Sequence, residues 1–585
     1  QIWTGLYAGN LDHFNQYGGW VPFYCSHKIL AGLRDAWLYT DSELAKELYR
    51  GLCDWSVNLI RNINDSQMQS VLGWEHGGMN ETLIDAYRLF GDERYLSAAK
   101  RYSHQHEING MQGAEGKYST TFLNGQHANT QVPKFIGFER IYQEQNSNKT
   151  YRIAAHNFWD DVATHRTVCI GGNSVSEHFL GYENGEEYLK NIDGPESCNS
   201  NNMLKLSEIL FDETHDAKYV DFYENTMWNH ILATQDPTTG GYVYFTSLRP
   251  QSYRIYSQVN QAMWCCVGTG MENHGKYGEF IYTHTDDELY VNLFVASQLN
   301  WKEKKFVLTQ ETNFPYEETV RFTVDKKSKS QKLKLKIRCP WWVKPGEMKV
   351  VCNGKDYAVG AQPSSYIEID RKWKKGDVIE VSMPMKVTIE ELPNLSNYIA
   401  IMRGPILLGA RMGTDNLVGL VADDGRWAHI AHGPLVSLFD TPFLIGERAD
   451  IQKKLEGMQP VSGKPLHFTV PGLFEEKFKN LELEPFCHIH DSRYMMYWLA
   501  LSKDGYQEYL ADLAAEEAAK LKLEGRTVDQ VQPAEQQPET DHKMLFERST
   551  TGNTNNVFFR EAQHGGWFSY ELATEGKTDL ALYLK

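Results

Sequence analysis

The sequence has no apolar run long enough to span a lipid bilayer, and its basic residues are few relative to its acidic ones. The 59 Lys and Arg residues are outnumbered by 76 Asp and Glu residues, which gives a formal net charge of −17 at pH 7. An acidic chain of this kind is a poor ligand for nucleic acid or for an anionic membrane surface. We therefore predict no transmembrane helix and no polyanionic partner.

A framework of disulfide bonds is also lacking. The nine cysteines are an odd number without regular spacing in a chain of 585 residues, so a disulfide scaffold is not expected. No secretory leader is visible, because the opening "QIWTGLYAGNLDHF" already has a globular character. The closing "TDLALYLK" has the pattern of a strand, and we expect both ends to be incomplete. The missing leader therefore does not exclude export.

Helical periodicity dominates the first half of the chain. The whole chain of 585 residues is long enough for two to four domains. Apolar residues recur at three- and four-residue steps in segments interrupted by turn residues at 40–42, 91–92 and 212–216. Antiparallel helix pairs that recur in this way form either a solenoid or a closed (α/α) toroid. We favour the toroid, because polar motifs fall between the helices, where the loops of a toroid converge on a central pocket. The 15 Trp and 32 Tyr suit either stacking on sugars or a large helical core.

Strand periodicity begins at about residue 285. "KLKLKIRCP", "SYIEIDRKW" and "DVIEVSMP" alternate apolar and polar residues between turns. We predict a multidomain α+β protein in which an N-terminal helical barrel precedes antiparallel β-sandwich domains. The expected domains are a helical barrel, a β-sandwich, a further β-rich segment that ends in a helix, and a partial C-terminal β module, at residues 1–285, 286–400, 401–525 and 526–585.

Four candidate metal ligands lie in two short clusters. Glu196 and Cys198 occur in "GPESCNSNNM", and Cys265 and Cys266 occur in "MWCCVG". Three thiolates and a carboxylate form a reasonable tetrahedral zinc site. The spacing alone favours ordinary buried thiols over a metal site. A Gly-Pro turn before Glu196 and a Gly-x-Gly turn after Cys266 place both clusters in loops, which favours the metal site.

Several motifs together resemble glycoside hydrolase family 146, a relative of family 127, whose members are β-L-arabinofuranosidases of gut bacteria that digest plant glycans. The motifs include "WEHGGMNETL", "HANTQVPKFIGFERIY", "IGGNSVSEHF", "GPESCNSNNML" and "MWCCVGTGMENHGKYGE". The resemblance implies an (α/α)₆ catalytic barrel with β-sandwich domains, a zinc ion bound by one Glu and three Cys, and a cysteine nucleophile. By motif, the zinc ligands would be Glu196, Cys198, Cys265 and Cys266. Cys265 would also be the nucleophile, and Glu177 the general acid/base.

The chemistry expected from this resemblance is that of a retaining glycosidase in which a thiolate replaces the usual nucleophilic carboxylate. Zinc ligation would keep the Cys265 thiol deprotonated. Glu177 would have to be protonated at first, which requires a raised pKa from burial or from a nearby negative charge. We therefore expect a zinc-dependent, retaining exo-glycosidase that releases L-arabinofuranose from β-linked plant cell-wall glycans.

Candidate substrate contacts are His27, His76, His127 and Tyr244. Members of the family use several histidines to bind sugar hydroxyls, yet each of these three could equally be a structural histidine. Tyr244 in "GYVYFTSL" matches a sugar-contacting tyrosine of family 127 better. Met263 stands where family 127 has a further cysteine, which changes the wall of that pocket.

Three alternatives remain at this point. The same fold and site could act on another pectic sugar, or the protein could be a carbohydrate-binding protein with a structural zinc ion, since four protein ligands complete a structural site. The extra carboxyl of Glu177 argues against the second alternative. A polysaccharide lyase or epimerase would need a cluster of Arg or Lys for the substrate carboxylate, and none accompanies these motifs. By the resemblance, the partner is an arabinofuranose-containing glycan, and the location is periplasmic or on the surface of a bacterial cell.

Overall fold

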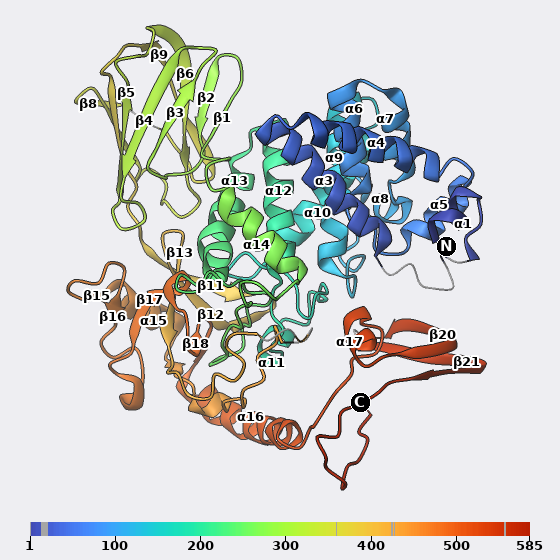
Figure 1. The fold of residues 1–585 in the computed structure, drawn as a ribbon. Coiled ribbons are helices and arrows are strands. Elements are labelled where there is room, and N and C mark those ends of the chain that lie inside the picture. The colour runs from blue at the N-terminus through green and yellow to red at the C-terminus, as the bar shows by residue number, and fades with distance from the viewer. Residues whose placement is uncertain are drawn as a thin grey trace.

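The structure is a computed structural model that describes residues 2–12, 14, 21–357, 360–422, 425, 428–554 and 557–584. Helices dominate the chain as far as α14, and strands dominate the remainder (Figure 1). This order confirms the predicted fold class, a helical barrel-like domain followed by β domains. Within the described part of the chain, no helix combines the length and apolarity needed to cross a membrane.

The helical domain is built from antiparallel helix pairs joined by short turns. Helix α3 packs on α4, α6 on α7 and α9, α9 on α10 and α12, and α12 on α13. Its helices are α1 (Ile2–Tyr7), α3 (Pro22–Thr40), α4 (Glu43–Leu59), α5 (Asp65–Leu72), α6 (Met79–Phe90), α7 (Glu93–Arg101), α8 (Gln105–Met111), α9 (Ala128–Gln145), α10 (Lys149–Asp161), α11 (Glu187–Lys190), α12 (Ser197–Thr214), α13 (Ala217–Thr226) and α14 (Cys265–Gly275).

Local sequence explains where these helices begin and end. The Ser42 side chain caps α4 by accepting a hydrogen bond from the backbone N–H of Ala45. Gly91 ends α6 at a φ of 69°, a left-handed conformation that costs glycine little, and Asp92 then caps α7. The apolar stripes meet in one core, to which each fully buried large side chain, such as Phe135, contributes about 1.5–3 kcal/mol.

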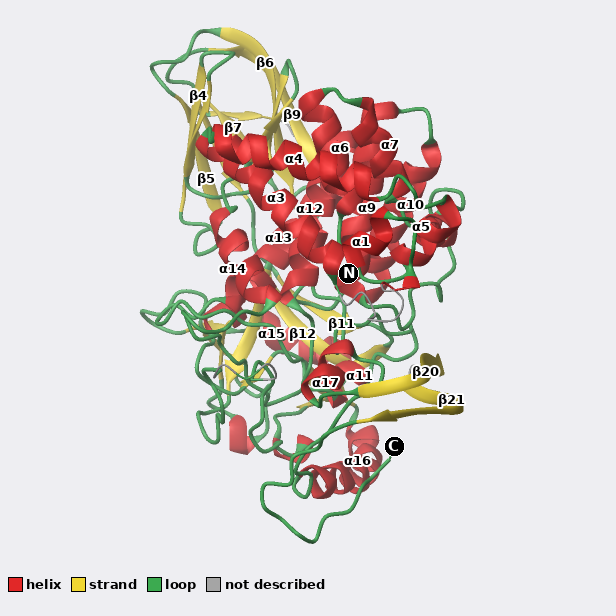
Figure 2. Cartoon of the chain, turned by 45° about the vertical axis from the view of Figure 1, so that its right-hand side comes forward, coloured by secondary structure: helices red, strands yellow, loops and turns green. Residues whose placement is uncertain are grey.

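A β-sandwich follows the helical domain and lies beside it (Figure 2). One sheet has the strand order β1-β2-β6-β9 and the other β3-β4-β5-β10-β7-β8. All neighbours are antiparallel except β2 and β6, which run parallel, a pairing that alternation of apolar residues does not reveal. Apolar residues of both sheets form a single core. The strands are β1 (Tyr282–His284), β2 (Glu288–Val291), β3 (Ser297–Trp301), β4 (Phe306–Thr312), β5 (Thr319–Val324), β6 (Gln331–Cys339), β7 (Lys349–Cys352), β8 (Lys355–Tyr357), β9 (Ser365–Trp373) and β10 (Val378–Ser382).

A second β domain packs under the helical domain. Its main sheet has the order β14-β19-β12-β13-β17-β16-β15, with β11 beside β12 and β18 beside β13. Helices α15 and α16 accompany it, and the chain continues through α17 into the hairpin β20–β21 (Figure 1). The elements are β11 (Val387–Leu392), β12 (Leu395–Arg403), β13 (Ile406–Arg411), β14 (Leu444–Ile445), α15 (Arg448–Glu456), β15 (Gln459–Pro460), β16 (Phe468–Thr469), β17 (Glu482–Pro485), β18 (Tyr494–Met495), β19 (Trp498–Leu501), α16 (Lys503–Glu524), α17 (Gln536–Asp541), β20 (Leu545–Thr554) and β21 (Val557–Ser569).

Hydrogen bonds fix this second β domain against the helical domain. The Asn229 amide donates to the carbonyl of Pro405, at 2.8 Å, and its carbonyl accepts from the N–H of Leu407, also at 2.8 Å. The Tyr497 hydroxyl accepts from the N–H of Cys169 at 2.9 Å. The loop that leads into the candidate site, at residues 167–196, therefore rests on a β-sheet scaffold.

Candidate active site

Two helix N-termini bring the four predicted metal ligands together. Glu196 is the N-cap of α12 and Cys198 lies in its first turn, whereas Cys265 and Cys266 are the first two residues of α14. One ligand atom from each of the four lies within 4.8 Å of every other. The positive ends of both helix dipoles therefore face these anionic groups and stabilise them.

The arrangement of the four ligand atoms fits a tetrahedral ion. Cys265 Sγ lies 4.0 Å from Cys266 Sγ and 3.9 Å from Glu196 Oε1, and Cys266 Sγ lies 3.8 Å from the same oxygen. Sulfur atoms bound to one zinc ion at about 2.3 Å stand about 3.8 Å apart. Glu196 Oε2 is buried and makes no hydrogen bond with any described residue. The donor set and its spacing therefore suit Zn²⁺.

A second layer of side chains orients these ligands. The Asn129 amide donates to Glu196 Oε1 at 3.2 Å and is held by the Asn202 amide at 2.7 Å. The Thr269 hydroxyl lies 2.9 Å from Cys198 Sγ. Such neighbours are typical of metal sites, where they fix the direction of each ligand.

The three thiols differ in exposure and acidity. Cys198 and Cys266 are buried, and burial raises their pKa values well above the usual range. Cys265 is partly exposed, and hydrogen bonds from the Cys198 and Cys266 thiols hold its pKa well below the usual value. Cys265 is therefore the first of the three to ionise and the one that a small molecule can reach.

Tyr244 links Cys265 to Glu177. Its hydroxyl lies 3.6 Å from Cys265 Sγ and donates a short hydrogen bond to Glu177 Oε1. The other carboxylate oxygen lies 3.5 Å from His127 Nε2. The structure thus brings together four of the predicted residues, one of which, Glu177, has a φ of 66°. A side chain at such an angle adds strain of order 1–3 kcal/mol, which the surrounding loop sustains.

The expectation of a raised pKa for Glu177 is wrong. Burial does raise it, but the hydrogen bonds from His127 and Tyr244 and the positive charge of His127 outweigh burial and lower the pKa to about 2. For His127 the signs are reversed. Burial lowers the pKa of the imidazole, but the neighbouring carboxylates of Glu177, Glu75 and Glu196 outweigh burial and raise it to about 10. At neutral pH the two side chains therefore share one proton, which resides on the imidazole.

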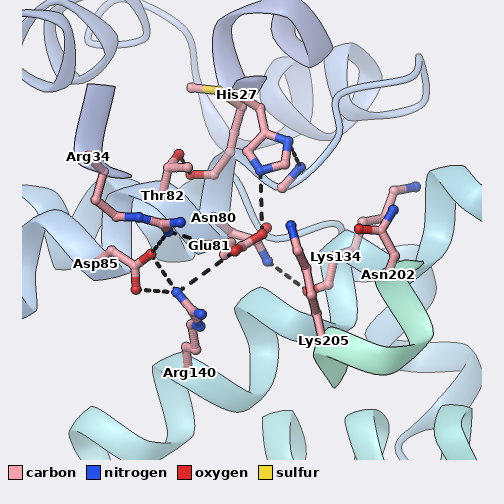
Figure 3. A network of polar contacts seen from close by, with 12 residues as sticks. His27, Arg34, Asn80, Glu81, Thr82, Asp85, Lys134, Arg140, Asn202 and Lys205 are labelled. Atoms are coloured by element: carbon pink, nitrogen blue, oxygen red, sulfur yellow. Dashed lines mark hydrogen bonds and ion pairs between the residues drawn. The ribbon is translucent and has the colours of Figure 1, made fainter. Parts of the chain in front are cut away.

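His27 and His76 lie in other surroundings. His27 is buried, accepts from the N–H of Gly78 at 3.0 Å through Nδ1, and lies 3.3 Å from Glu81 through Nε2 (Figure 3). His76 is fully buried, with Nδ1 3.2 Å from the carbonyl oxygen of Trp74. Burial lowers the pKa of both rings, so both are neutral.

Figure 3 shows the network to which His27 belongs. Glu81 and Asp85 of α6 contact Arg34 of α3 and Arg140 of α9. The Asp85 carboxylate binds both guanidinium groups directly. Arg34 also pairs with Asp35 at 2.8 Å, and the charge of Lys205 acts on Glu81. Three acidic and three basic side chains thus balance, and the pairs with arginine join three helices of the domain.

Sequence reasoning missed several groups around the site. Glu75 is close enough to Glu177 and Cys265 that their negative charges, after burial, raise its pKa. His429 of the second β domain stacks on the Tyr244 ring with centroids 4.3 Å apart. Glu75 precedes His76 in a motif already singled out, but nothing near His429 in the sequence indicates this contact.

The C-terminal segment also reaches the site. The ring of Phe558 in β21 lies 4.4 Å from that of His178, the neighbour of Glu177. Burial raises the pKa of Glu535, and the negative charges of Glu177 and Asp193 raise it further. Met263, by contrast, is 91 % exposed and lies at the surface beside the thiol cluster.

The chain matches two family models of the same enzymes. Residues 4–279 match the GH127 catalytic domain of β-L-arabinofuranosidases, and residues 288–385 match the GH127 middle domain. Residues 388–500 and 522–585 match two domains of unknown function. No functionally curated protein matches the chain.

Solved structures share the fold. A GH127 β-arabinofuranosidase is 20 % identical, with a TM-score of 0.63 over 82 % of this chain and 76 % of its own. A GH127 β-L-arabinofuranosidase from Geobacillus stearothermophilus T6 is 16 % identical, with a TM-score of 0.62 over 85 % of this chain and 81 % of its own. A glycoside hydrolase with 17 % identity has a TM-score of 0.60 over 82 % and 83 % of the two chains.

The catalytic and middle models together cover more than half of the residues, and the buried Glu/Cys cluster lies within the catalytic one. The chain therefore belongs to the GH127 β-L-arabinofuranosidase family of glycoside hydrolases.

Proposed function

We propose that this protein is a zinc-dependent, retaining exo-glycosidase that releases L-arabinofuranose from β-linked plant cell-wall glycans. The observation that supports this most strongly is the Tyr244 hydroxyl, which contacts both the Cys265 sulfur and the Glu177 carboxylate. A nucleophile and an acid/base that share one hydrogen-bond partner are close enough to act on the same sugar, as a retaining mechanism requires.

Cys265 is the proposed nucleophile. It differs from Cys198 and Cys266 in being partly exposed and in facing Tyr244, while all three belong to the candidate metal cluster. When bound, Zn²⁺ supplies positive charge that keeps coordinated sulfur atoms deprotonated. Glu196, Cys198, Cys265 and Cys266 would hold the ion.

Glu177 and His127 together are the proposed acid/base. Their shared proton rests on His127 Nε2, moves across the 3.5 Å contact to Glu177 Oε2, and passes from Glu177 to the leaving group. Once that proton has left, Glu177 is a carboxylate beside a neutral His127, so the pair is able to accept a proton from water in the second half of the reaction.

The reaction has two displacements. Cys265 Sγ bonds to C1 of the sugar while the C1–O bond breaks and the leaving oxygen takes the proton from Glu177. Glu177 then takes a proton from water, the water oxygen bonds to C1, and the C1–S bond breaks to return the thiolate. Two inversions leave the configuration at C1 unchanged.

Three regions border the site, which supports the exo mode. The helical domain supplies Glu177, the second β domain supplies His429, and the C-terminal segment supplies Phe558. A site enclosed in this way suits one terminal sugar rather than the middle of a chain. The motifs further support assignment to family 146, and the resemblance supports a periplasmic or cell-surface location.

Hydrolysis of synthetic aryl glycosides tests the proposal. We expect release from an aryl β-L-arabinofuranoside, little release from the α-anomer, and a first-formed sugar of β configuration by NMR. Cys25→Ser, at an exposed thiol of α3, is the matched control for Cys265→Ser. Cleavage of a different pectic glycoside alone, or binding of the β-L-arabinofuranoside without cleavage, would refute the proposal.

A further inference from the structure

A second cluster of ligand-type side chains lies at the opposite end of α12. Glu139 of α9, His156 of α10 and Glu213 of α12 each place one nitrogen or oxygen within 4.8 Å of the others. His156 Nε2 lies 3.9 Å from Glu139 Oε2 and 3.6 Å from Glu213 Oε2. Glu213 follows Cys198 by 15 residues of helix, so the two clusters are about 22 Å apart.

Glu139 makes no hydrogen bond in this cluster. Its side chain is fully buried, and neither carboxylate oxygen makes a hydrogen bond with any described residue. The nearby Gln143 amide donates to the carbonyl of Ile209 instead. A buried carboxylate without a partner is strongly unfavourable, so this group requires either a proton or a cation.

His156 presents a free nitrogen to the same point. The residue is 5 % exposed, and Nε2 makes no hydrogen bond with any described residue. Its other nitrogen, Nδ1, lies 3.0 Å from the Tyr219 hydroxyl, which fixes the ring with Nε2 toward the two carboxylates. A histidine held through one nitrogen by a second-layer partner is typical of metal ligands.

The charges around the cluster leave an excess of negative charge. Arg152 is the basic group in direct contact, and it binds Glu213 at 3.0 and 3.2 Å and Glu115 at 3.0 Å. One guanidinium is thus shared by two carboxylates. Burial and the negative charge of Glu213 raise the pKa of Glu139 to about 8, so Glu139 holds a proton at neutral pH and becomes a third carboxylate when a cation replaces that proton. A single divalent cation would restore neutrality.

We propose that Glu139, His156 and Glu213 bind a second divalent metal ion, of which Zn²⁺ best suits one imidazole and two carboxylates. Water would complete the coordination. The ion would join α9, α10 and α12 (Figure 1), about 22 Å from the thiol cluster, and we expect it to stabilise the helical domain without taking part in hydrolysis. This inference is independent of the proposed function.

The number of zinc ions bound per chain, measured after dialysis of the full chain against Zn²⁺, tests the second metal site. We expect two zinc ions per wild-type chain, one in Glu139→Gln with hydrolysis unchanged, and one in Cys198→Ser with hydrolysis lost. One ion per wild-type chain, or two in Glu139→Gln, would overturn the proposal.

A second measurement does not depend on the stability of Glu139→Gln. Co²⁺ bound to the Cys198→Ser chain should give the weak visible bands of nitrogen and oxygen ligation without sulfur-to-metal charge transfer, and Zn²⁺ should displace it. Absence of bound cobalt in that folded variant would also contradict the second site.

Discussion

The network of Figure 3 and the site around Glu177 both lie in the helical domain, but their charges differ. In the network, the carboxylates of Glu81 and Asp85 contact the guanidinium groups of Arg34 and Arg140. Around Glu177, the acidic Glu75, Asp193, Glu196 and Cys265 outnumber the cationic His127 and the Lys134 ammonium, whose charge acts on Glu75.

This difference separates structural from chemical roles. A balanced network is complete without a ligand, and it joins helices α3, α6 and α9. A site with excess negative charge is incomplete until a cation or a proton is added, which is what a metal-thiolate nucleophile and a shared acid/base proton provide. The comparison predicts that mutations in the first region change stability and that mutations in the second change turnover.

The largest expected effect comes from Cys265→Ser, which replaces the proposed nucleophile. A serine hydroxyl is not ionised at neutral pH, so kcat should fall by about 10³-fold or more. Steady-state hydrolysis of an aryl β-L-arabinofuranoside measures it, with Cys25→Ser as the unaffected control. Turnover within tenfold of wild type would remove Cys265 from the mechanism.

Cys198→Ser should remove the zinc ion of the thiol cluster together with most of the activity. One neutral hydroxyl in place of a thiolate typically weakens a zinc site by orders of magnitude. Elemental analysis and steady-state kinetics on the same preparation give the zinc content and the activity. Full activity in protein that has lost this zinc would show that the ion is not needed.

Asp85→Asn addresses the other side of the comparison. The change removes the carboxylate that Arg34 and Arg140 both bind directly and leaves them Glu81, 3.8–3.9 Å away. We therefore expect a loss of about 3 kcal/mol in the free energy of unfolding. Denaturant unfolding measures stability, and kcat per folded molecule should stay within about threefold of wild type. A large fall in kcat with unchanged stability would contradict the structural role of this network.

Tyr244→Phe should slow hydrolysis by about ten- to hundredfold, because a hydrogen bond to a charged group contributes about 1.5–3 kcal/mol. The Tyr244 hydroxyl is, after His127, one of the groups that lower the pKa of Glu177, so its loss raises that pKa. Below its pKa, Glu177 is protonated and no longer forms the charged pair with His127. The acidic limb of kcat/KM against pH should therefore move to higher pH. An unchanged limb would show that the Tyr244 hydroxyl does not influence the pKa of Glu177.

The smallest effect is expected for Phe558→Ala at the rim of the site. An aromatic pair adds about 0.5–1.5 kcal/mol, so a two- to tenfold rise in KM with little change in kcat should follow the loss of the contact with His178. The same kinetics on Phe546→Ala, in the paired strand β20, provide the control. Equal effects of both changes would mean that the hairpin acts only as a whole.

The sequence was informative where apolar residues recur with a regular period and where a residue type is scarce. The switch from helical to strand periodicity predicted the order of the domains, and only nine cysteines among 585 residues made the pair Cys265–Cys266 conspicuous. Glu139, His156 and Glu213 lie on three different helices among 76 acidic residues, so no spacing connects them.

The histidines show a second limit of prediction. In the sequence, His27 and His127 both occur near polar motifs and are equally good candidates for sugar contacts. Tertiary structure separates them, because Gly78 and Glu81 occupy the nitrogens of His27, whereas His127 contacts Glu177. The sign of the Glu177 pKa shift was also unpredictable, since it depends on two hydrogen-bond donors that are distant in the chain.

Covalent trapping tests the central claim most directly. The full, zinc-loaded chain would be incubated with an epoxide inactivator of β-L-arabinofuranosyl configuration and digested for peptide mass spectrometry. We predict one adduct, on Cys265, formed at a rate that competing L-arabinofuranose reduces. An adduct on Cys198, Cys266 or Glu177, or no adduct while the enzyme hydrolyses its substrate, would contradict the assignment of Cys265 as the nucleophile.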